Sequence, residues 1–263
     1  MRFDIITLFP ELLTAFMASG VTRRAFEGGQ LEVHLWNPRE YATGQYRRVD
    51  DRPFGGGPGM VMLAEPLWQC LCAIRTQRQQ DRTLAPLLYF SPLGEALNHE
   101  RVTHWSQSTK GAVLLCGRYE GVDQRFIDAH VDAQISLGDF VLSGGEIPAM
   151  AFLDAIARLM PGVLHDPDSH VSDSFNPSMQ GLLDCPHYTR PEVWQGEAVP
   201  EVLLSGHHAQ IHAWRRTQSL AQTHRYRPDL IAAARGSRQL TRQDEADLSK
   251  LAPIDPTQKN KLQ

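Results

Sequence analysis

Short apolar segments alternate with longer amphipathic segments along residues 1–161. The apolar segments predict β-strands at residues 3–9, 31–36, 87–91, 112–117 and 134–137. The amphipathic segments predict helices at residues 10–26, 64–80, 123–130 and 147–159. Strands that alternate with helices are typical of an α/β domain with a largely parallel sheet, so we expect this fold class.

The last of these helices has one apolar face. Phe152, Ala155, Ile156 and Leu159 recur at helical spacing, which predicts a buried stripe. Arg158 falls on another side of the same helix. It is therefore available for a role other than packing.

The chain changes character after residue 161. Pro161 and Gly162 predict the end of the helix, and residues 165–181 are rich in Asp, Ser, His, Pro and Asn without any periodicity. An arginine-rich and helical pattern follows. We therefore expect a domain at residues 1–161, a flexible linker at 162–181, a smaller helical domain at 182–251 and a disordered tail at 252–263.

The composition is that of an ordinary soluble protein. Of the 263 residues, 42% are hydrophobic and 21% are charged. The longest apolar runs fall far short of the roughly 20 residues that a membrane-spanning helix needs, and the first residues lack the pattern of a secretory leader. The four cysteines (Cys70, Cys72, Cys116 and Cys185) form neither a disulfide framework nor paired metal-binding motifs. These features predict a cytoplasmic protein without a membrane anchor.

Positive charge is concentrated near the C-terminal end. The net charge of −4 argues against binding of a polyanion over the whole surface. Between residues 211 and 242, however, the sequence contains seven arginines and only one carboxylate, Asp229, so the net charge of this segment is +6. The pattern indicates a polyanion that docks on part of the surface, although a solvated helix face would explain it equally well.

Three glycine-bearing loops lie next to predicted strands, at residues 50–60, 116–123 and 137–148. Loops at the carboxyl ends of strands are where open α/β sheets bind ligands. The first loop lacks the Gly-Lys-Ser/Thr ending of a phosphate-binding P-loop, and no Gly-x-Gly-x-x-Gly spacing is present. Together the three loops favour a nucleotide-like ligand over a triphosphate or a dinucleotide.

The same loops carry a family resemblance. VDDRPFGGGPGM (49–60), CGRYEG (116–121) and GDFVLSGGE (138–146) resemble motifs of the bacterial tRNA (guanine-N1)-methyltransferase family, TrmD. Three further blocks follow in the family's order: DSF (173–175), GLLDCPHYTRP (181–191) and VLLSGHH (202–208). The resemblance covers residues 1–227.

The resemblance implies an α/β domain of the SPOUT type, whose C-terminal part is tied in a deep trefoil knot. It implies that S-adenosyl-L-methionine binds in this knot, held mainly by the backbone of three loops. It also implies a homodimer whose active sites lie at the subunit interface and whose tRNA spans both subunits. The residues that match the cofactor-binding positions are Tyr89, Phe90, Ser91, Pro92, Gly94, Gly117, Arg118, Tyr119, Glu120, Gly121, Leu137, Gly138, Asp139, Phe140, Val141, Leu142, Gly144, Gly145 and Pro148.

The implied reaction moves a methyl group to N1 of the guanine 3′ to the anticodon, at position 37 of tRNA, and forms 1-methylguanosine. N1 carries a proton at neutral pH, and the resemblance assigns its removal to Asp173. A carboxylate is far more acidic than guanine N1, so the step needs charge stabilisation. The resemblance assigns Arg158 to the negative charge that develops on guanine O6. Magnesium is implicated in the family, and Glu120 is the expected contributor to its site.

The residues alone leave other functions open. A methyltransferase of similar fold that acts on ribosomal RNA or on a ribose 2′-hydroxyl would not need Asp173. A non-catalytic RNA-binding module would use the arginine-rich segment, with Arg215 and Arg216 as candidate phosphate contacts, and would bind no cofactor. A nicotinamide oxidoreductase is disfavoured by the missing dinucleotide motif. His207 and His208 suggest a metal ion, but no third ligand is evident.

Overall fold

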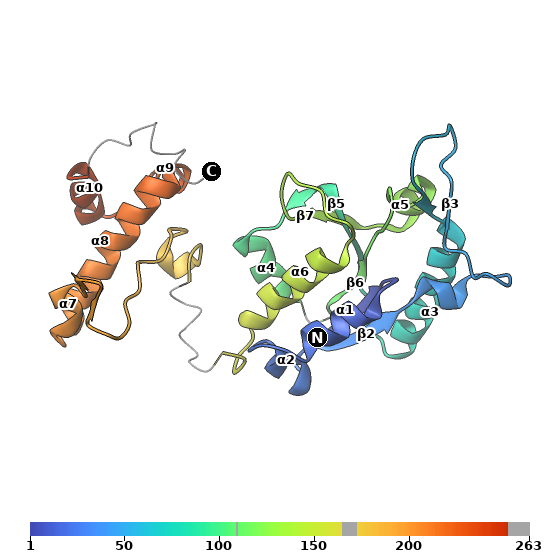
Figure 1. The fold of residues 1–263 in the computed structure, drawn as a ribbon, viewed down its shortest axis with the longest axis horizontal. Coiled ribbons are helices and arrows are strands. Elements are labelled where there is room, and N and C mark those ends of the chain that lie inside the picture. Colours follow the sequence, from blue (N-terminus) through green and yellow to red (C-terminus); the bar gives the residue numbers. More distant parts are fainter. Residues whose placement is uncertain (109, 165–172, 252–263) are drawn as a thin grey trace. The chain divides into compact units, whose positions relative to one another are not determined.

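The computed structural model describes residues 1–108, 110–164 and 173–251. The chain forms two compact units, Met1–Pro167 and Asp168–Gln263 (Figure 1), and each is considered by itself. The expected tail at 252–263 and residues 165–172 of the expected linker lie outside the described residues. No helix in the described ranges has the length and apolar character needed to cross a membrane.

A parallel sheet forms the centre of the first unit. Its strands are β1 (Arg2–Ile6), β2 (Glu32–Trp36), β5 (Leu87–Ala96), β6 (Ala112–Leu115) and β7 (Ala133–Ser136). They lie in the order β2-β1-β6-β5-β7, and every neighbouring pair is parallel. Two short strands, β3 (Asp50–Asp51) and β4 (Val61–Met62), form a separate antiparallel pair. The predicted α/β class with a parallel sheet is confirmed.

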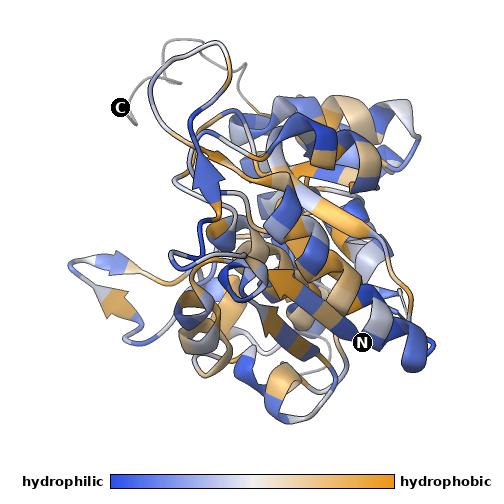
Figure 2. Ribbon diagram, turned by 90° about the vertical axis from the view of Figure 1, so that its right-hand side faces the viewer, coloured by the Kyte–Doolittle hydropathy of each residue, from blue (hydrophilic) through white to orange (hydrophobic). Residues whose placement is uncertain are grey.

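Helices cover both faces of this sheet, so its strands are buried on both sides. Successive strand residues belong to two different core clusters: Leu88 and Leu114 lie in one, Leu87 and Val113 in the other. Figure 2 shows hydrophobic colouring on strands and mixed colouring on the helices around them. The first cluster includes residues of α1 (Pro10–Met17), α2 (Arg23–Glu27), α4 (His99–Ser106) and α6 (Glu146–Arg158), and the second includes residues of α3 (Ala64–Gln80) and α5 (Gln124–His130). A 3₁₀ helix, Pro38–Tyr41, packs beside α3.

One predicted helix is two helices in the structure. The sequence predicts a single helix at residues 10–26, but the chain leaves the helical path between Met17 and Arg23. Gly20 adopts a φ of +72° there, a conformation that favours glycine. Helices α3 and α6 match their predictions to within one residue. The sequence does not predict α4, which buries a single residue, Val102.

Strand β5 runs past its predicted end at residue 91 and pairs with β7 in two registers. Phe90 lies opposite Ile135, and after an irregularity Glu95 lies opposite Ile135 again. Gly94 permits the second approach, because a Cβ there would lie 2.4 Å from the backbone nitrogen of Ile135. The residues between the two registers are thereby displaced from the sheet.

A buried ion-pair cluster joins β1 to α3. Arg78, only 1% exposed, donates from Nε to Asp4 Oδ2 at 2.5 Å, and Arg2 donates two further hydrogen bonds to Asp4. The remaining nitrogens of Arg78 donate to the backbone carbonyls of Arg2, Thr83, Lys110 and Ala112. The buried charges are compensated by these bonds, which is the condition under which such groups are tolerated.

The second unit is mostly helical, with a small core around Leu220, Ile231 and Leu248. Its elements are a 3₁₀ helix (Pro177–Met179), β8 (Val193–Trp194), β9 (Glu197–Ala198), α7 (Glu201–Leu204), α8 (His208–Tyr226), α9 (Pro228–Gly236) and α10 (Arg242–Ser249). Arg216 donates to both carboxylate oxygens of Asp244, at 2.9 and 3.0 Å. Burial would raise the pKa of Asp244, but the hydrogen bonds from Arg216 and Thr241 outweigh burial and lower this pKa to about 2.

Residues 173–181, at the end of the expected linker, are tied to the rest of this second unit. The backbone nitrogen of Asp184 donates to Ser174 Oγ at 2.9 Å, and that of Phe175 donates to the Leu182 carbonyl at 3.0 Å. The side chain of Gln180 accepts a hydrogen bond from Arg216 on α8. Asp173 is thus the first described residue of a segment with its own internal contacts.

Candidate active site

The carboxyl ends of β5, β6 and β7 surround a cavity of about 240 Å³ in the first unit. This is the edge of an open α/β sheet where ligands bind. The lining residues come from all three strand ends and the loops that follow them. They are Tyr89, Phe90, Ser91, Pro92, Gly117, Arg118, Tyr119, Glu120, Gly121, Ile135, Ser136, Leu137, Gly138, Phe140, Val141, Leu142, Ser143, Gly144, Gly145 and Pro148.

The structure brings most of the predicted cofactor-binding residues together in this cavity. All of them line it except Gly94, which lies against β7, and Asp139. Three lining residues are absent from the sequence prediction: Ile135, Ser136 and Ser143. The first two belong to β7 and are interior strand residues by pattern, so the sequence gives no signal that they line a cavity.

Glycines allow the backbones around the cavity to approach closely. A Cβ on Gly145 would lie 2.6 Å from Cα of Cys116, and a Cβ on Gly117 would lie 2.8 Å from the ring of Tyr89. The backbone nitrogen of Gly145 donates to the carbonyl of Gly117 at 2.9 Å, which joins the two loops directly. At these glycines the cavity wall is main chain, which offers amide and carbonyl groups to a polar ligand.

The first glycine-rich loop lies against the second loop and does not itself line the cavity. The backbone nitrogen of Glu120 donates to the Met60 carbonyl, and that of Met62 donates to the Gly121 carbonyl, both at 2.9 Å. Gly59 sits so close to Glu120 that a Cβ would overlap that side chain. These contacts show that the first loop supports the second, while Phe54 at its tip is 99% exposed.

Arg118 connects three parts of the site through a buried carboxylate. Its Nε donates to Glu146 Oε2 at 2.8 Å and its Nη1 to the Ser143 carbonyl at 3.2 Å. Glu146 is fully buried, and its Oε1 accepts a hydrogen bond from Thr7 Oγ1 at 2.7 Å. The guanidinium also lies over the ring of Phe9, 4.3 Å from its centroid. Arg118 is among the residues predicted to bind the cofactor, whereas Glu146 and Thr7 are not, because a contact between residues so far apart in the chain gives no local signal.

Two other titratable groups, Tyr89 and Cys116, lie at or beside the cavity. Burial raises the pKa of the Tyr89 hydroxyl and raises that of the Cys116 thiol well above its ordinary value, with a further contribution from Glu146 to the Cys116 shift. Both groups therefore stay protonated near neutral pH. Neither can act as the base that guanine N1 would require.

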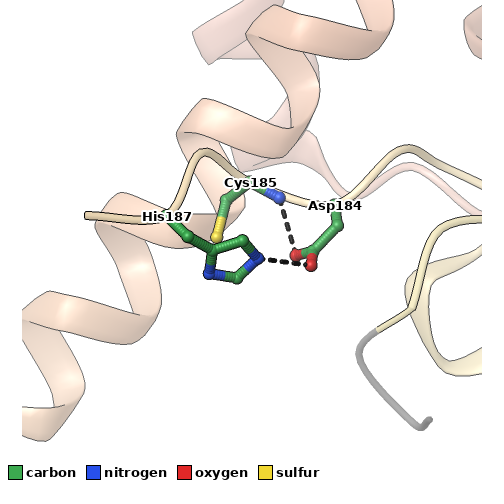
Figure 3. A group of neighbouring side chains, drawn as sticks. All are labelled: Asp184, Cys185 and His187. Carbon is green, nitrogen blue, oxygen red and sulfur yellow. Dashed lines mark hydrogen bonds and ion pairs between the residues drawn. The ribbon is translucent and has the colours of Figure 1, made fainter. Parts of the chain in front are cut away.

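One group of three potential metal ligands occurs within the described residues: Asp184, Cys185 and His187, whose ligand atoms lie within 4.8 Å of one another (Figure 3). Both oxygens of Asp184 are already hydrogen-bonded, to the Cys185 backbone nitrogen at 2.7 Å and to His187 Nε2 at 2.8 Å. Burial raises the pKa of Cys185, which disfavours the thiolate that binds metal. We therefore interpret Asp184, Cys185 and His187 as a hydrogen-bonded turn and not as a metal site. Glu120, His207 and His208 do not belong to this group.

The arginine-rich segment is partly neutralised by ion pairs. Arg216, Arg227 and Arg235 pair with Asp244, Asp229 and Glu245, respectively. Arg216, which the sequence suggests as a phosphate contact, is therefore held by an ion pair within the second unit. Arg215, Arg225, Arg238 and Arg242 of the segment are exposed and form no ion pair with another residue that the structure describes.

The family model described as tRNA (Guanine-1)-methyltransferase TrmD matches residues 1–233. The chain belongs to the TrmD family. Curated relatives agree with this assignment, and each of the following is named tRNA (guanine-N(1)-)-methyltransferase. The protein of Paracidovorax citrulli is 69% identical over 252 residues (95% of this chain, 98% of the relative). Those of Albidiferax ferrireducens and Burkholderia multivorans are 67% and 55% identical over 249 and 252 residues, covering 95% of this chain and 99% and 94% of the relatives.

The two predicted catalytic residues of this TrmD family member lie in different units. Asp173 is a partly buried residue of the second unit. Arg158 is the last residue of α6, at the opposite end from Glu146, and it does not line the cavity. At 1.5 Å per residue, the two ends of this helix are about 18 Å apart. Within the first unit, the structure therefore separates Arg158 from the cavity.

Proposed function

We propose that this chain transfers a methyl group from S-adenosyl-L-methionine to N1 of guanine 37 of tRNA and forms 1-methylguanosine. Membership of the TrmD family and relatives that share the same name over nearly their whole length support this function. The observation that carries it furthest is the cavity at the strand ends, which gathers nearly all the residues that match the family's cofactor positions.

S-adenosyl-L-methionine fits the character of this cavity. Gly117 and Gly145 leave a main-chain cradle that a Cβ would fill, and Tyr89 and Phe140 provide apolar surface beside it. Main-chain groups of this kind suit the polar edge of an adenine or a ribose. The bound cofactor supplies an electrophilic methyl group on its sulfonium. The protein's part is to hold that methyl group in line with N1 of the base, and orientation of this kind accounts for a large share of such rate gains.

The second unit supplies the base in this proposal. Asp173 accepts the N1 proton of guanine, and Arg158 stabilises the negative charge that develops on O6 as the proton leaves. Tyr89 and Cys116 beside the cavity stay protonated, so neither of them competes with Asp173 for the role of base. Hydrogen bonds within residues 173–185 give the segment that carries Asp173 a defined conformation, which supports this role.

A homodimer with active sites at the subunit interface is part of the proposal. The position of Arg158, one helix length from the cavity, is explained if it serves the cavity of a second subunit. Apolar side chains near the cavity are exposed, which supports the proposal that a second subunit covers this surface. The exposed fractions of Tyr119, Phe140, Val141 and Ile147 are 45%, 54%, 87% and 47%. The tRNA would then contact both subunits, with Arg215, Arg225, Arg238 and Arg242 available for its phosphates.

Three finer features belong to the proposal on the family's account: the trefoil knot, a cytoplasmic location and assistance by magnesium. Mg²⁺ commonly binds one or two carboxylates and keeps several waters. Glu120 offers one exposed carboxylate at the cavity, and within the described part of the chain it belongs to no group of three potential metal ligands. These residues do not form a preformed magnesium cage, and the mechanism above has no step that depends on one.

The test is methyl transfer from labelled S-adenosyl-L-methionine to unmodified tRNA with guanine at position 37, with the same tRNA carrying adenine 37 as the matched control. We expect 1-methylguanosine in the first tRNA and no label in the second. Label in ribosomal RNA or on a ribose would support the rival methyltransferase. Binding of tRNA without cofactor binding or transfer would support the RNA-binding module.

A further inference from the structure

The first unit contains a fully buried carboxylate, Glu146, that the proposed mechanism does not use. Burying an ionised carboxylate is costly unless it is paired and hydrogen-bonded. Here one oxygen faces the guanidinium of Arg118 at 2.8 Å and the other accepts from the Thr7 hydroxyl at 2.7 Å. Glu146 itself does not line the cavity, whereas Arg118 does.

We propose that Glu146 is a positioning residue for cofactor binding, which acts by fixing Arg118 between the second and third glycine loops. Arg118 lies on the second loop, and its Nη1 donates to the Ser143 carbonyl on the third. The two loops also form a backbone bridge between Arg118 and Gly144. A single buried charge therefore determines where both loops stand at the cavity wall. This inference rests on the proposed binding of S-adenosyl-L-methionine.

The surroundings of Gly144 leave little room for the Arg118 side chain to shift. A Cβ on Gly144 would lie 2.2 Å from Nε of Arg118, so the guanidinium passes directly over that glycine. On its other side, the same guanidinium lies over the ring of Phe9. The Arg118 side chain is only 18% exposed, so without its carboxylate partner its charge would be largely buried and uncompensated. We therefore expect the side chain to move toward solvent when Glu146 loses its charge.

Thr7 extends this arrangement to the sheet. Its side chain is fully buried just beyond the end of β1, and its Oγ1 also accepts a hydrogen bond from the backbone nitrogen of Phe9 at 3.0 Å. The hydroxyl thus orients Glu146 and also fixes the backbone of Phe9, whose ring lies over Arg118. Replacement of Thr7 by valine keeps the shape of the side chain and removes its hydrogen bonds to Glu146 and from Phe9, so it is the mildest perturbation of the set.

The chain offers a matched control on β1, the strand that ends just before Thr7. Asp4 is another fully buried carboxylate paired with arginine, but its partners Arg2 and Arg78 lie outside the cavity lining. Asp4→Asn therefore measures what the loss of a buried ion pair does to the fold alone. Glu146→Gln removes the corresponding charge beside the cavity with the size of the side chain retained.

The experiment measures the dissociation constant of S-adenosyl-L-methionine by calorimetry, together with KM, kcat and the melting temperature, for full-length protein. We expect Glu146→Gln and Thr7→Val to weaken cofactor binding by roughly 10- to 100-fold and by a few-fold, respectively, since small misplacements of a site have effects of this size. The KM for tRNA should change by less than about 2-fold, and Glu146→Asp should recover part of the affinity. Asp4→Asn should lower the melting temperature and leave the cofactor affinity of the folded protein unchanged.

A double variant, Arg118→Lys with Glu146→Gln, should bind the cofactor no more weakly than the worse single variant, because both changes break the same interaction. Additive losses would overturn the inference. So would cofactor affinity in Thr7→Val and Glu146→Gln equal to that of the wild type, or a loss of cofactor affinity in Asp4→Asn as large as that in Glu146→Gln. If the wild type itself binds no S-adenosyl-L-methionine, the proposed function fails first, and the two failures are thereby distinguished.

Discussion

Gly145 lies so close to Cys116 that a Cβ on the glycine would be 2.6 Å from the cysteine's Cα. This contact places the beginning of α6 directly against the end of β6 and brings the Gly145 nitrogen to the Gly117 carbonyl. The cavity wall depends on this close approach of two backbones. A side chain as small as a methyl group would separate them.

The first prediction follows from this contact. Gly145→Ala should weaken the binding of S-adenosyl-L-methionine by more than about 10-fold, because overpacking forces the backbone at the cavity to shift. Gly236→Ala is the matched control, since a Cβ there meets no atom within 4 Å and its backbone is compatible with alanine. Calorimetric titration of both variants checks the prediction. Equal affinities would show that the approach of these loops is not needed for binding.

The second prediction separates two neighbouring arginines of α8. Arg215 is exposed, whereas Arg216 pairs with Asp244. Arg215→Ala should weaken tRNA binding and reduce its salt dependence by about one counterion without a change in melting temperature. Arg216→Ala should instead lower the melting temperature, because it leaves the buried Asp244 without its partner. Binding isotherms at several salt concentrations, with thermal melts, check both. A reversed pattern would contradict the assignment of Arg216 as structural.

Local patterns in the sequence predict the first unit well where contacts are local. Helix α3 follows directly from its amphipathic sequence, and the loops after β6 and β7 are apparent from their glycines. The interruption at Gly20 is less evident, because a single glycine within a helical pattern is often tolerated. The second register of β5 on β7 depends on a tertiary approach at Gly94, which no periodicity reports.

The site shows the same limit. The cofactor positions are found by resemblance because they lie in contiguous motifs. The pairs between Thr7 and Glu146, and between Arg216 and Asp244, join residues that are distant in the sequence. Charge counting therefore predicts Arg216 as a free cation, although a tertiary ion pair neutralises it.

The third prediction concerns pH. The pKa of Asp244 is lowered from its ordinary value of 3.8 to about 2 in the folded chain, so the folded state holds this proton less tightly than the unfolded state. The stabilisation is complete above pH 4 and is lost as the pH falls toward 2. The difference in unfolding free energy between the wild type and Asp244→Asn should therefore shrink by about 2 kcal/mol over this range. Urea unfolding at a series of pH values measures it, and a constant difference would contradict the role of this ion pair.

The fourth prediction tests the shared active site. At a cofactor concentration below the weakened affinity of Gly145→Ala, this variant's cavity should be nearly empty, and Asp173→Ala should remove the base, so each homodimer should have little activity. In a mixed dimer, one cavity and one Asp173 remain intact on different subunits. If the active site spans the interface, co-expression of the two variants should restore a substantial part of the activity of one site. Complete absence of activity in isolated mixed dimers would place both functions within one subunit.

The most direct test of the central claim is single-turnover methyl transfer to tRNA with guanine 37 by the wild type and by Asp173→Asn, at saturating S-adenosyl-L-methionine. The account predicts 1-methylguanosine from the wild type. It predicts a rate at least about 100-fold lower from the variant, with unchanged cofactor affinity, since general-base catalysis contributes roughly that much or more. Equal rates would contradict the assignment of Asp173, and the absence of 1-methylguanosine with the wild type would contradict the proposed function.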